Sequence, residues 1–252
     1  MNSSRLAPAA ARPLPGPSIS CPDPNHFVTT ALHQFAESLG NAIDAKDPHT
    51  SMHSDEVAEV ARALALAMGL TPSQAAVIHV AGHLHDIGKI GVPDAVLKKQ
   101  GPLTTAEWRA VRNHPEAGAA ILAPVTALSR LGVVAMVLHH HERWDGKGYP
   151  HGLKGAAIPL GARIISVADT LSAMLQNRPY RAALDIDLAR REIERGAGTQ
   201  FDPAVVAAFR RASGKILRLV RPAPDAAAGD DDASGGRGPA PDPAQEPFGK
   251  GS

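Results

Sequence analysis

The sequence predicts an all-α protein, with a single helical-bundle domain between two tails. Through the central part of the chain apolar residues recur at intervals of three and four, helix-start signals precede them, and no segment alternates for long as a strand does. Residues 1–24 and 222–252 are instead rich in Ala, Pro, Gly, Ser and Asp, with few large apolar residues. Such segments bury too little surface to offset the entropy lost on ordering, so we expect both tails to be disordered. The predicted domain spans residues 25–215.

Two helices are predicted between residues 53 and 86. The first, over residues 53–68, carries valine, leucine and alanine on one face, and Gly69 ends it. Thr71 is then placed as an N-cap and Pro72 as the first helical residue, where the missing N–H of proline costs nothing. This second helix is expected to continue to about Asp86.

A connection rich in glycine and proline is predicted over residues 88–102. After it, Thr104 and Glu107 have the spacing of a capping box, which predicts the start of a helix. Because Pro115 disfavours helical backbone at the residue before it, this helix should break near His114.

Five further helices complete the predicted bundle, and the metal site described below is expected to lie between facing helices, as is common in bundles. Their predicted ranges are 116–122, 127–140, 160–175, 186–195 and 203–212.

The composition excludes several classes of function. A net charge of +1 argues against non-specific binding to a nucleic-acid polymer, which needs a basic face. No apolar stretch approaches the roughly 18 residues that span a bilayer. The single cysteine, Cys21, lies in the predicted tail and cannot form an internal disulfide. We therefore expect a soluble, cytoplasmic protein that binds neither a nucleic-acid polymer nor a membrane.

A set of histidines and aspartates points to metal chemistry. Imidazole and carboxylate together suit iron, manganese, zinc or nickel, and the set exceeds what one tetrahedral ion can use. Two metals a few ångströms apart commonly hydrolyse phosphate esters, so the pattern indicates a metal-dependent phosphohydrolase. The candidate ligands are His53, His85, Asp86, His114, His140, His141 and Asp169.

These candidates differ in strength when each is taken alone. An isolated His-Asp pair such as His85-Asp86 is more often a helix end with a solvated carboxylate, but Lys89 just beyond it is placed to meet a phosphate. Asp169 follows an apolar stretch in which an unpaired carboxylate would be expensive. Taken alone, His53 and His114 are weak evidence for a metal site, because either could be a helix cap or a core histidine. The remaining histidines, His26, His33, His79, His83 and His151, are interpreted as structural, and His139 as a bystander in its triplet.

Residues 85–89 (HDIGK) and 140–150 (HHERWDGKGYP) resemble the HD-GYP family, a bacterial branch of the HD phosphohydrolases. The similarity continues through residues 178–181 and 200–203. It implies hydrolysis of cyclic di-GMP to pGpG and onward to GMP, with two or three metal ions, usually iron or manganese. A hydroxide bridging two metals would attack phosphorus.

The resemblance also assigns roles to individual residues. It implies that all the candidate ligands named above bind metal, with Asp86 as the bridge. Lys89 would contact a substrate phosphate and stabilise its charge, with Tyr149, Arg178 and Arg181 helping to hold the phosphate backbone.

His49 is the one departure from the family pattern. Members with three metals carry a glutamate four residues before the position of His53, where this chain has His49. His49 is therefore either a ligand of a third ion or a bystander beside two ions, and we favour two.

Two other functions compete with hydrolysis of cyclic di-GMP. The first is hydrolysis of another cyclic dinucleotide or of a nucleotide phosphate ester. The second is a catalytically silent module that binds the dinucleotide or a GGDEF-type diguanylate cyclase; a response regulator is a further candidate partner.

Overall fold

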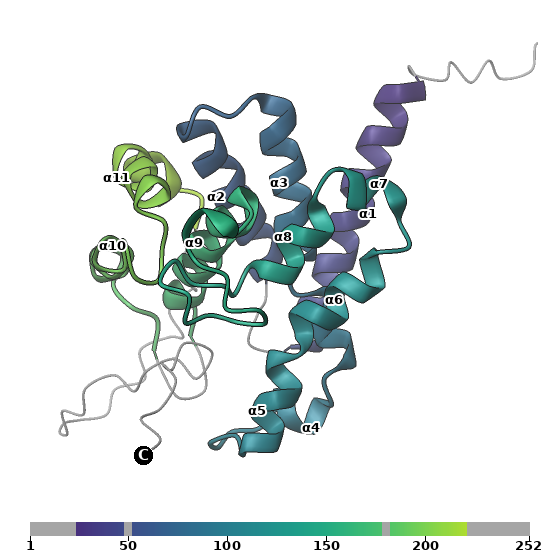
Figure 1. Ribbon diagram of the computed structural model, residues 1–252, viewed down its shortest axis with the longest axis vertical. Coiled ribbons are helices and arrows are strands. Elements are labelled where there is room, and N and C mark those ends of the chain that lie inside the picture. The colour runs from purple at the N-terminus through teal and green to yellow at the C-terminus, as the bar shows by residue number, and fades with distance from the viewer. Residues whose placement is uncertain (1–23, 48–51, 178–181, 221–252) are drawn as a thin grey trace, which may run out of the picture.

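The computed structural model describes residues 24–47, 52–177 and 182–220, which form helices and one isolated bridge between Ala197 and Phe201 (Figure 1). The predicted all-α class is confirmed. The helices of the first half are α1 (Pro24–Lys46), α2 (His53–Ala67), α3 (Pro72–Leu84), the 3-10 helix η1 (Ile87–Gly91), α4 (Asp94–Leu97), α5 (Thr105–Arg112) and α6 (His114–Leu122). Those of the second half are α7 (Thr126–Arg130), α8 (Val133–His139), the 3-10 helix η2 (Gly155–Ala157), α9 (Leu160–Leu175), α10 (Ile186–Arg195) and α11 (Pro203–Ile216).

Helix α9 lies at the centre of the bundle. It contacts α2, α3, α8, α10 and α11. Its apolar residues Ile165 and Leu171 are completely buried, and so are Val57 and Leu64 of α2. Burial of such side chains contributes about 1.5–3 kcal/mol each, so this contact is a main source of stability. A polar side chain on α9 is therefore held in a rigid, largely dry setting.

The helix starts predicted from capping signals are confirmed. The hydroxyl of Thr71 accepts a hydrogen bond from the backbone N–H of Gln74 at 3.2 Å, and that of Thr104 accepts one from Glu107 at 3.3 Å. In both cases the side chain of the third helical residue, Gln74 or Glu107, accepts a hydrogen bond from the backbone N–H of the threonine, which completes a capping box. The predicted break at His114 is also present, because α5 ends at Arg112 and α6 begins at His114.

Three of the predicted ranges differ from the structure. The single helix expected over residues 127–140 is wrong, since Gly132 adopts a left-handed φ of 79° that separates α7 from α8. Helix α11 runs on to Ile216, and Val220 beyond it is 2% exposed, so the apolar core extends past residue 212. Residues 88–102 were predicted to be an irregular connection, but they include most of η1 and all of α4.

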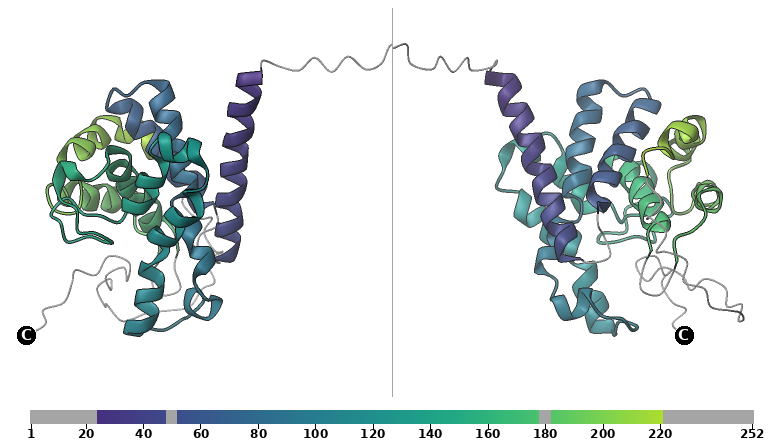
Figure 2. Two further views of the ribbon diagram at one scale, coloured as in Figure 1. Left: turned by 45° about the vertical axis from the view of Figure 1, so that its right-hand side comes forward. Right: turned by 180° about the vertical axis from the view of Figure 1, so that it is seen from behind.

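Helix α1 stands along one side of the bundle, as both views of Figure 2 show. It packs on α2, α3 and η1. Its residues had given no clear sequence signal, although Ala36 and Ile43 are both buried against the core.

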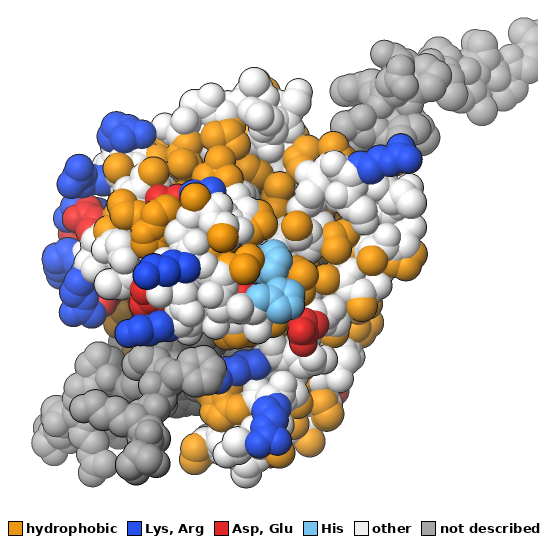
Figure 3. All heavy atoms as spheres, viewed as in Figure 1, with side chains coloured by type: hydrophobic (Ala, Val, Ile, Leu, Met, Phe, Trp, Pro, Cys, Tyr) orange, Lys and Arg blue, Asp and Glu red, His pale blue; other side chains and the backbone are white. Residues whose placement is uncertain are grey.

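Helix α10 shows the amphipathic pattern of an outer helix. It buries Ala189 and Ile193 completely, while its arginines are at least partly exposed. Lysine and arginine side chains accordingly gather along the edge formed by α10 and α11 (Figure 3). Within the three described ranges, every helix is too short or too polar to cross a bilayer. Apart from Pro24, which begins α1, both predicted tails, Cys21 included, lie outside these ranges.

Candidate metal centre

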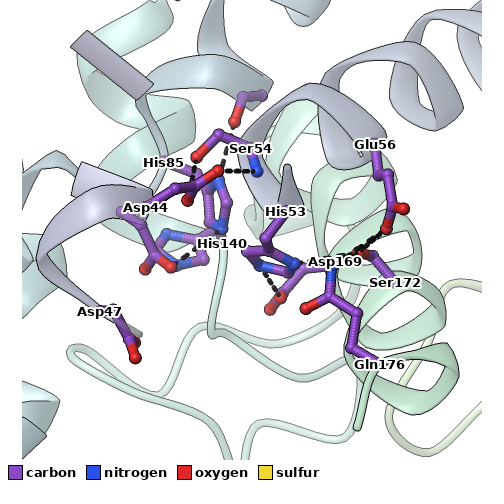
Figure 4. Close-up of polar contacts among 12 residues, drawn as sticks. Asp44, Asp47, His53, Ser54, Glu56, His85, His140, Asp169, Ser172 and Gln176 are labelled. Carbon is purple, nitrogen blue, oxygen red and sulfur yellow. Dashed lines mark hydrogen bonds and ion pairs between the residues drawn. The ribbon is translucent and has the colours of Figure 1, made fainter. Parts of the chain in front are cut away.

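The predicted ligands converge in the interior from five different helices or helix ends. Their donor atoms form two groups that share one residue, Asp86. One group joins Asp86 to His114, His140 and His141, and the other joins it to His53 and His85. Asp169 adds to the second group, because its Oδ1 lies 3.2 Å from His53 Nε2. Figure 4 shows His53, His85, His140 and Asp169 lying close together.

Three of the histidines are oriented by the same device. The Nδ1–H of each donates a 2.7 Å hydrogen bond to the backbone carbonyl three residues earlier, and since a carbonyl only accepts, this nitrogen must carry the proton. The pairs are His85 with Gly82, His114 with Val111, and His140 with Val137. This tautomer leaves the lone pair on Nε2, the form in which imidazole binds a metal. Burial opposes the charge on His85, but the carboxylates of Asp86 and Asp169 raise its pKa to about 9, so a metal ion would have to displace a proton from this ring.

Asp86 lies between these imidazoles with one oxygen toward each group. Its Oδ1 is 3.1 Å from His114 Nε2 and its Oδ2 is 3.3 Å from His85 Nε2. Lys89 Nζ is 2.8 Å from Oδ2. Burial alone would raise the pKa of Asp86, but Lys89 and the histidines hold it well below its ordinary value. Asp86 is therefore a buried carboxylate that stays ionised.

The donor set fits a divalent metal ion. The Nε2 of His85 is completely buried; Asp86 Oδ2 lies 3.3 Å from it, but within the described chain it makes no hydrogen bond of good geometry. An unmet buried nitrogen is costly unless something such as a metal uses its lone pair. Burial and the neighbouring imidazoles lower the pKa of His140 well below its ordinary value and that of His141 to about 3, so both are neutral donors.

His53 is oriented by residues that the sequence analysis did not identify. Its Nδ1 lies 3.0 Å from Ser172 Oγ, and this hydroxyl donates in turn to Glu56 Oε2 at 2.7 Å. Gln176 also donates to Glu56, at 3.1 Å (Figure 4). Because the hydroxyl of Ser172 donates to Glu56, it accepts a hydrogen bond from the Nδ1–H of His53. His53 Nε2 therefore keeps the lone pair that can bind a metal.

Helix α1 supports the centre from the other side. Asp44 accepts hydrogen bonds from the backbone N–H of Ser54 at 2.9 Å and from its hydroxyl at 2.8 Å, next to His53 (Figure 4). Lys46 donates to three backbone carbonyls of residues 89–92, at 3.1, 2.7 and 2.7 Å. These contacts fix the start of α2 and the turn that carries Asp86.

Gly88 lets this turn approach α6. A Cβ at this position would lie 1.9 Å from the carbonyl oxygen of His114 and 2.5 Å from the backbone nitrogen of Gly118. Only glycine therefore permits η1 and α6 to pack closely enough to place His114 beside Asp86.

The loop after His141 is closed by a buried carboxylate. Glu142, 2% exposed, accepts hydrogen bonds from the backbone N–H groups of His151 at 2.8 Å and Leu153 at 3.0 Å. At Gly148 a Cβ would lie 2.3 Å from the backbone nitrogen of Arg143. His139 lies apart from the centre, beside Glu142 and His151.

The remaining predicted site residues divide into those near the centre and those outside the described ranges. Tyr149 stacks on His141, with ring centroids 4.8 Å apart, and the guanidinium of Arg112 lies 5.6 Å from the centroid of Tyr149. Arg112 had not been predicted, and an arginine in an ordinary helix gives no sequence signal. His49, Arg178 and Arg181 lie outside the described residues.

Comparison with known proteins places this centre in a family. A family model described as an HD domain matches residues 37–205. The cyclic di-GMP phosphodiesterase response regulator RpfG of Xanthomonas campestris is 39% identical over 182 residues, which cover 72% of this chain and 48% of that protein. The 3'3'-cGAMP-specific phosphodiesterase 3 of Vibrio cholerae is 40% identical over 181 residues, which cover 72% of this chain and 39% of that protein.

The fold is shared with solved structures. One is Bd1817, an HDG"Y"P protein from Bdellovibrio bacteriovorus, with a TM-score of 0.57 and 16% identity over 75% of this chain and 63% of that one. The chain spans less than half the length of the two relatives above. The chain belongs to the HD domain family, and the resemblance to its HD-GYP branch is confirmed.

Proposed function

We propose that this chain is a phosphodiesterase that hydrolyses cyclic di-GMP with the aid of two divalent metal ions. The observation that carries the proposal is the position of Asp86, whose two oxygens face two separate groups of imidazoles. A carboxylate so placed is suited to bridge two ions. In this proposal His53, His85 and Asp169 complete one set of ligands, and His114, His140 and His141 complete the other.

Bound metal ions would supply a nucleophile at neutral pH and stabilise charge on the phosphoryl group. Mixed nitrogen and oxygen donors suit iron, manganese, zinc or nickel, and the resemblance to the HD-GYP family favours iron or manganese among these. We propose two ions, with His49 as a bystander; a third ion would require His49 or another residue as an added ligand.

Lys89 is the cation closest to the shared carboxylate. Its ammonium is also 3.3 Å from Asp47 Oδ2, so two carboxylates hold it at the centre. There it would stabilise negative charge that develops on the phosphate. We propose that Tyr149, Arg178 and Arg181 hold the phosphate backbone of the substrate.

The substrate proposal rests on relatives as well as geometry. The name of RpfG specifies cyclic di-GMP, and that protein is 39% identical to this chain. The expected products are pGpG and then GMP. A second candidate substrate is 3'3'-cGAMP, for which the 40% identical Vibrio protein is named specific.

Product analysis tests the proposal and separates the candidates. The full chain is loaded anaerobically with Fe²⁺ or Mn²⁺ and incubated with cyclic di-GMP, 3'3'-cGAMP and a linear nucleotide ester, and products are identified by mass spectrometry. Faster release of pGpG or GMP from cyclic di-GMP supports the proposal. A clear preference for 3'3'-cGAMP would favour the second candidate. Binding of either dinucleotide without turnover by the metal-loaded chain would favour a silent module.

The name of RpfG describes a phosphodiesterase that is itself a response regulator. For this chain we propose that a separate partner supplies the regulation. We propose a response regulator or a GGDEF-type diguanylate cyclase in that role. Co-purification of the full chain with each candidate tests it.

A further inference from the structure

A second group of histidines lies between α1, α2 and α3. His33, His79 and His83 each offer a ring nitrogen within 4.8 Å of the other two. His79 and His83 stand one helical turn apart on α3, and His33 comes from α1. His83 and His85 diverge by about 200° around α3, so this group faces away from the metal centre around Asp86, which is called the HD centre below.

Two of these imidazoles have one nitrogen directed at a carboxylate. His79 Nε2 forms a hydrogen bond of 3.1 Å with Glu59 Oε1. His83 Nδ1 lies 3.3 Å from Asp55 Oδ1 without the geometry of a hydrogen bond. Metal-binding histidines commonly have a carboxylate on the nitrogen that does not face the ion, because it fixes the tautomer and raises ligand basicity. Glu59 occupies this outer position for His79, and Asp55 is the carboxylate next to the corresponding nitrogen of His83.

The opposite nitrogens of the same two rings are buried without a partner. His79 is 5% exposed and His83 4% exposed. Neither His79 Nδ1 nor His83 Nε2 forms a hydrogen bond with any residue of the described ranges. A buried lone pair without a donor is costly, and a metal ion would satisfy both at once.

We propose that His33, His79 and His83 bind one divalent transition-metal ion, with Zn²⁺ as the ion to test, and that this ion links α1 to α3. Zinc accepts three histidines and one open position, with Zn–N distances of about 2.0–2.1 Å, which places the nitrogens about 3.4 Å apart. The nitrogens must therefore approach one another slightly. His33, half-buried and stacked on His79 at a centroid distance of 4.6 Å, turns about its side-chain torsions to complete the site.

Such an ion would act at a distance on the HD centre. Helix α1 carries Asp44 and Lys46, which hold the start of α2 and the carbonyls of η1. Fixing α1 against α3 near His33 therefore stabilises the helix that supports His53 and Asp86 from outside.

Zinc binding by a chain with a disabled HD centre tests this proposal. In the full-length Asp86→Ala/His140→Ala variant, Zn²⁺ is titrated in competition with a chromophoric chelator. We expect one equivalent of Zn²⁺ to remain bound. Adding His33→Gln should weaken its binding by at least about 100-fold, since even outer partners of metal ligands cost about 10–100-fold. His151→Gln, the same change at an exposed histidine, should leave it unchanged.

Three outcomes would overturn the proposal. The first is that the disabled chain retains no zinc, and the second is that zinc binds equally well with and without His33. The third is loss of zinc on His151→Gln, because this result would place the ion at His139, Glu142 and His151. Should circular dichroism show that the disabled chain does not fold, zinc content is compared in otherwise unaltered chains. His33→Gln must then contain one ion fewer than the wild type and His151→Gln the same number; equal content in all three overturns the proposal.

Discussion

The hydroxyl of Ser172 on α9 lies 3.0 Å from Nδ1 of His53 on α2, and it accepts a hydrogen bond from the N–H of that imidazole. Ser172 can only accept because its own proton goes to Glu56 at 2.7 Å. This chain of hydrogen bonds fixes the ring of His53 with Nε2 toward Asp169. It crosses between two helices that pack in the core.

Replacing Ser172 with alanine is expected to weaken metal binding by about 10–100-fold, the usual effect of losing a partner of a metal-binding histidine. The fold should be retained, because the change removes one small polar atom. Metal affinity by chelator competition is the measurement. Ser166→Ala on the same helix is the control, and equal affinities in the two variants would show that Ser172 does not orient His53.

Gly88 and Gly91 form a matched pair in η1. Gly88→Ala should push η1 away from α6, destabilise the protein by about 1–3 kcal/mol and lower its metal content, since the added Cβ meets backbone. Gly91→Ala should do neither, because no atom lies within 4 Å of its added Cβ. Thermal unfolding and metal analysis of both variants check this. A well-folded, fully metallated Gly88→Ala protein would contradict the close approach.

The three adjacent histidines 139–141 should respond differently to alanine. His140→Ala should strip metal, since its imidazole lies within the group around Asp86. His139→Ala should be mild, because that ring lies beside Glu142 and His151. Metal content per chain separates them, and loss of metal on His139→Ala alone would reverse the assignment.

Stability at the start of α5 should depend on pH through Glu107. Hydrogen bonds from Lys99 and from Thr104 lower the pKa of Glu107 to about 2. A lowered pKa stabilises the fold above the ordinary value of 4.5, and the effect is lost as pH falls toward 2. Glu107→Gln keeps an acceptor for Thr104 without the charge. Its melting temperature should therefore lie below that of the wild type at pH 7 and approach it at pH 3; a constant difference would contradict this.

Part of the histidine and aspartate cluster could be predicted from sequence through the motifs at residues 85–89 and 140–150, whereas His53 and His114 gave weak signals alone. Asp169 follows an apolar stretch, and Thr71 and Thr104 carry capping signals that depend on residues three positions away. Such local patterns can be recognised without knowledge of the fold. The helix break at Gly132 could not be predicted in this way. In sequence, a glycine with a left-handed backbone looks the same as a glycine that a continuous helix tolerates.

The supporting residues could not be predicted because their partners are distant in sequence. Ser172 lies 116 residues from Glu56, and Lys46 lies 44 residues from Ile90. An ordinary serine or lysine gives no sign of such a contact. His79 and His83 could have been noticed by their spacing, but His33 joins them only once α1 packs on α3.

Metal content and turnover measured together on the wild type and on Asp86→Ala test the central claim most directly. The wild type should bind two ions at the centre around Asp86, in addition to the zinc proposed at His33, His79 and His83, and it should hydrolyse cyclic di-GMP. Asp86→Ala should lose metal and at least about 100-fold in turnover, because no neighbouring carboxylate can take the shared position. The control is Asp187→Ala on the exposed side of α10, which should match the wild type. Metal content and turnover near wild type in Asp86→Ala would contradict the claim that this carboxylate joins two metal sites.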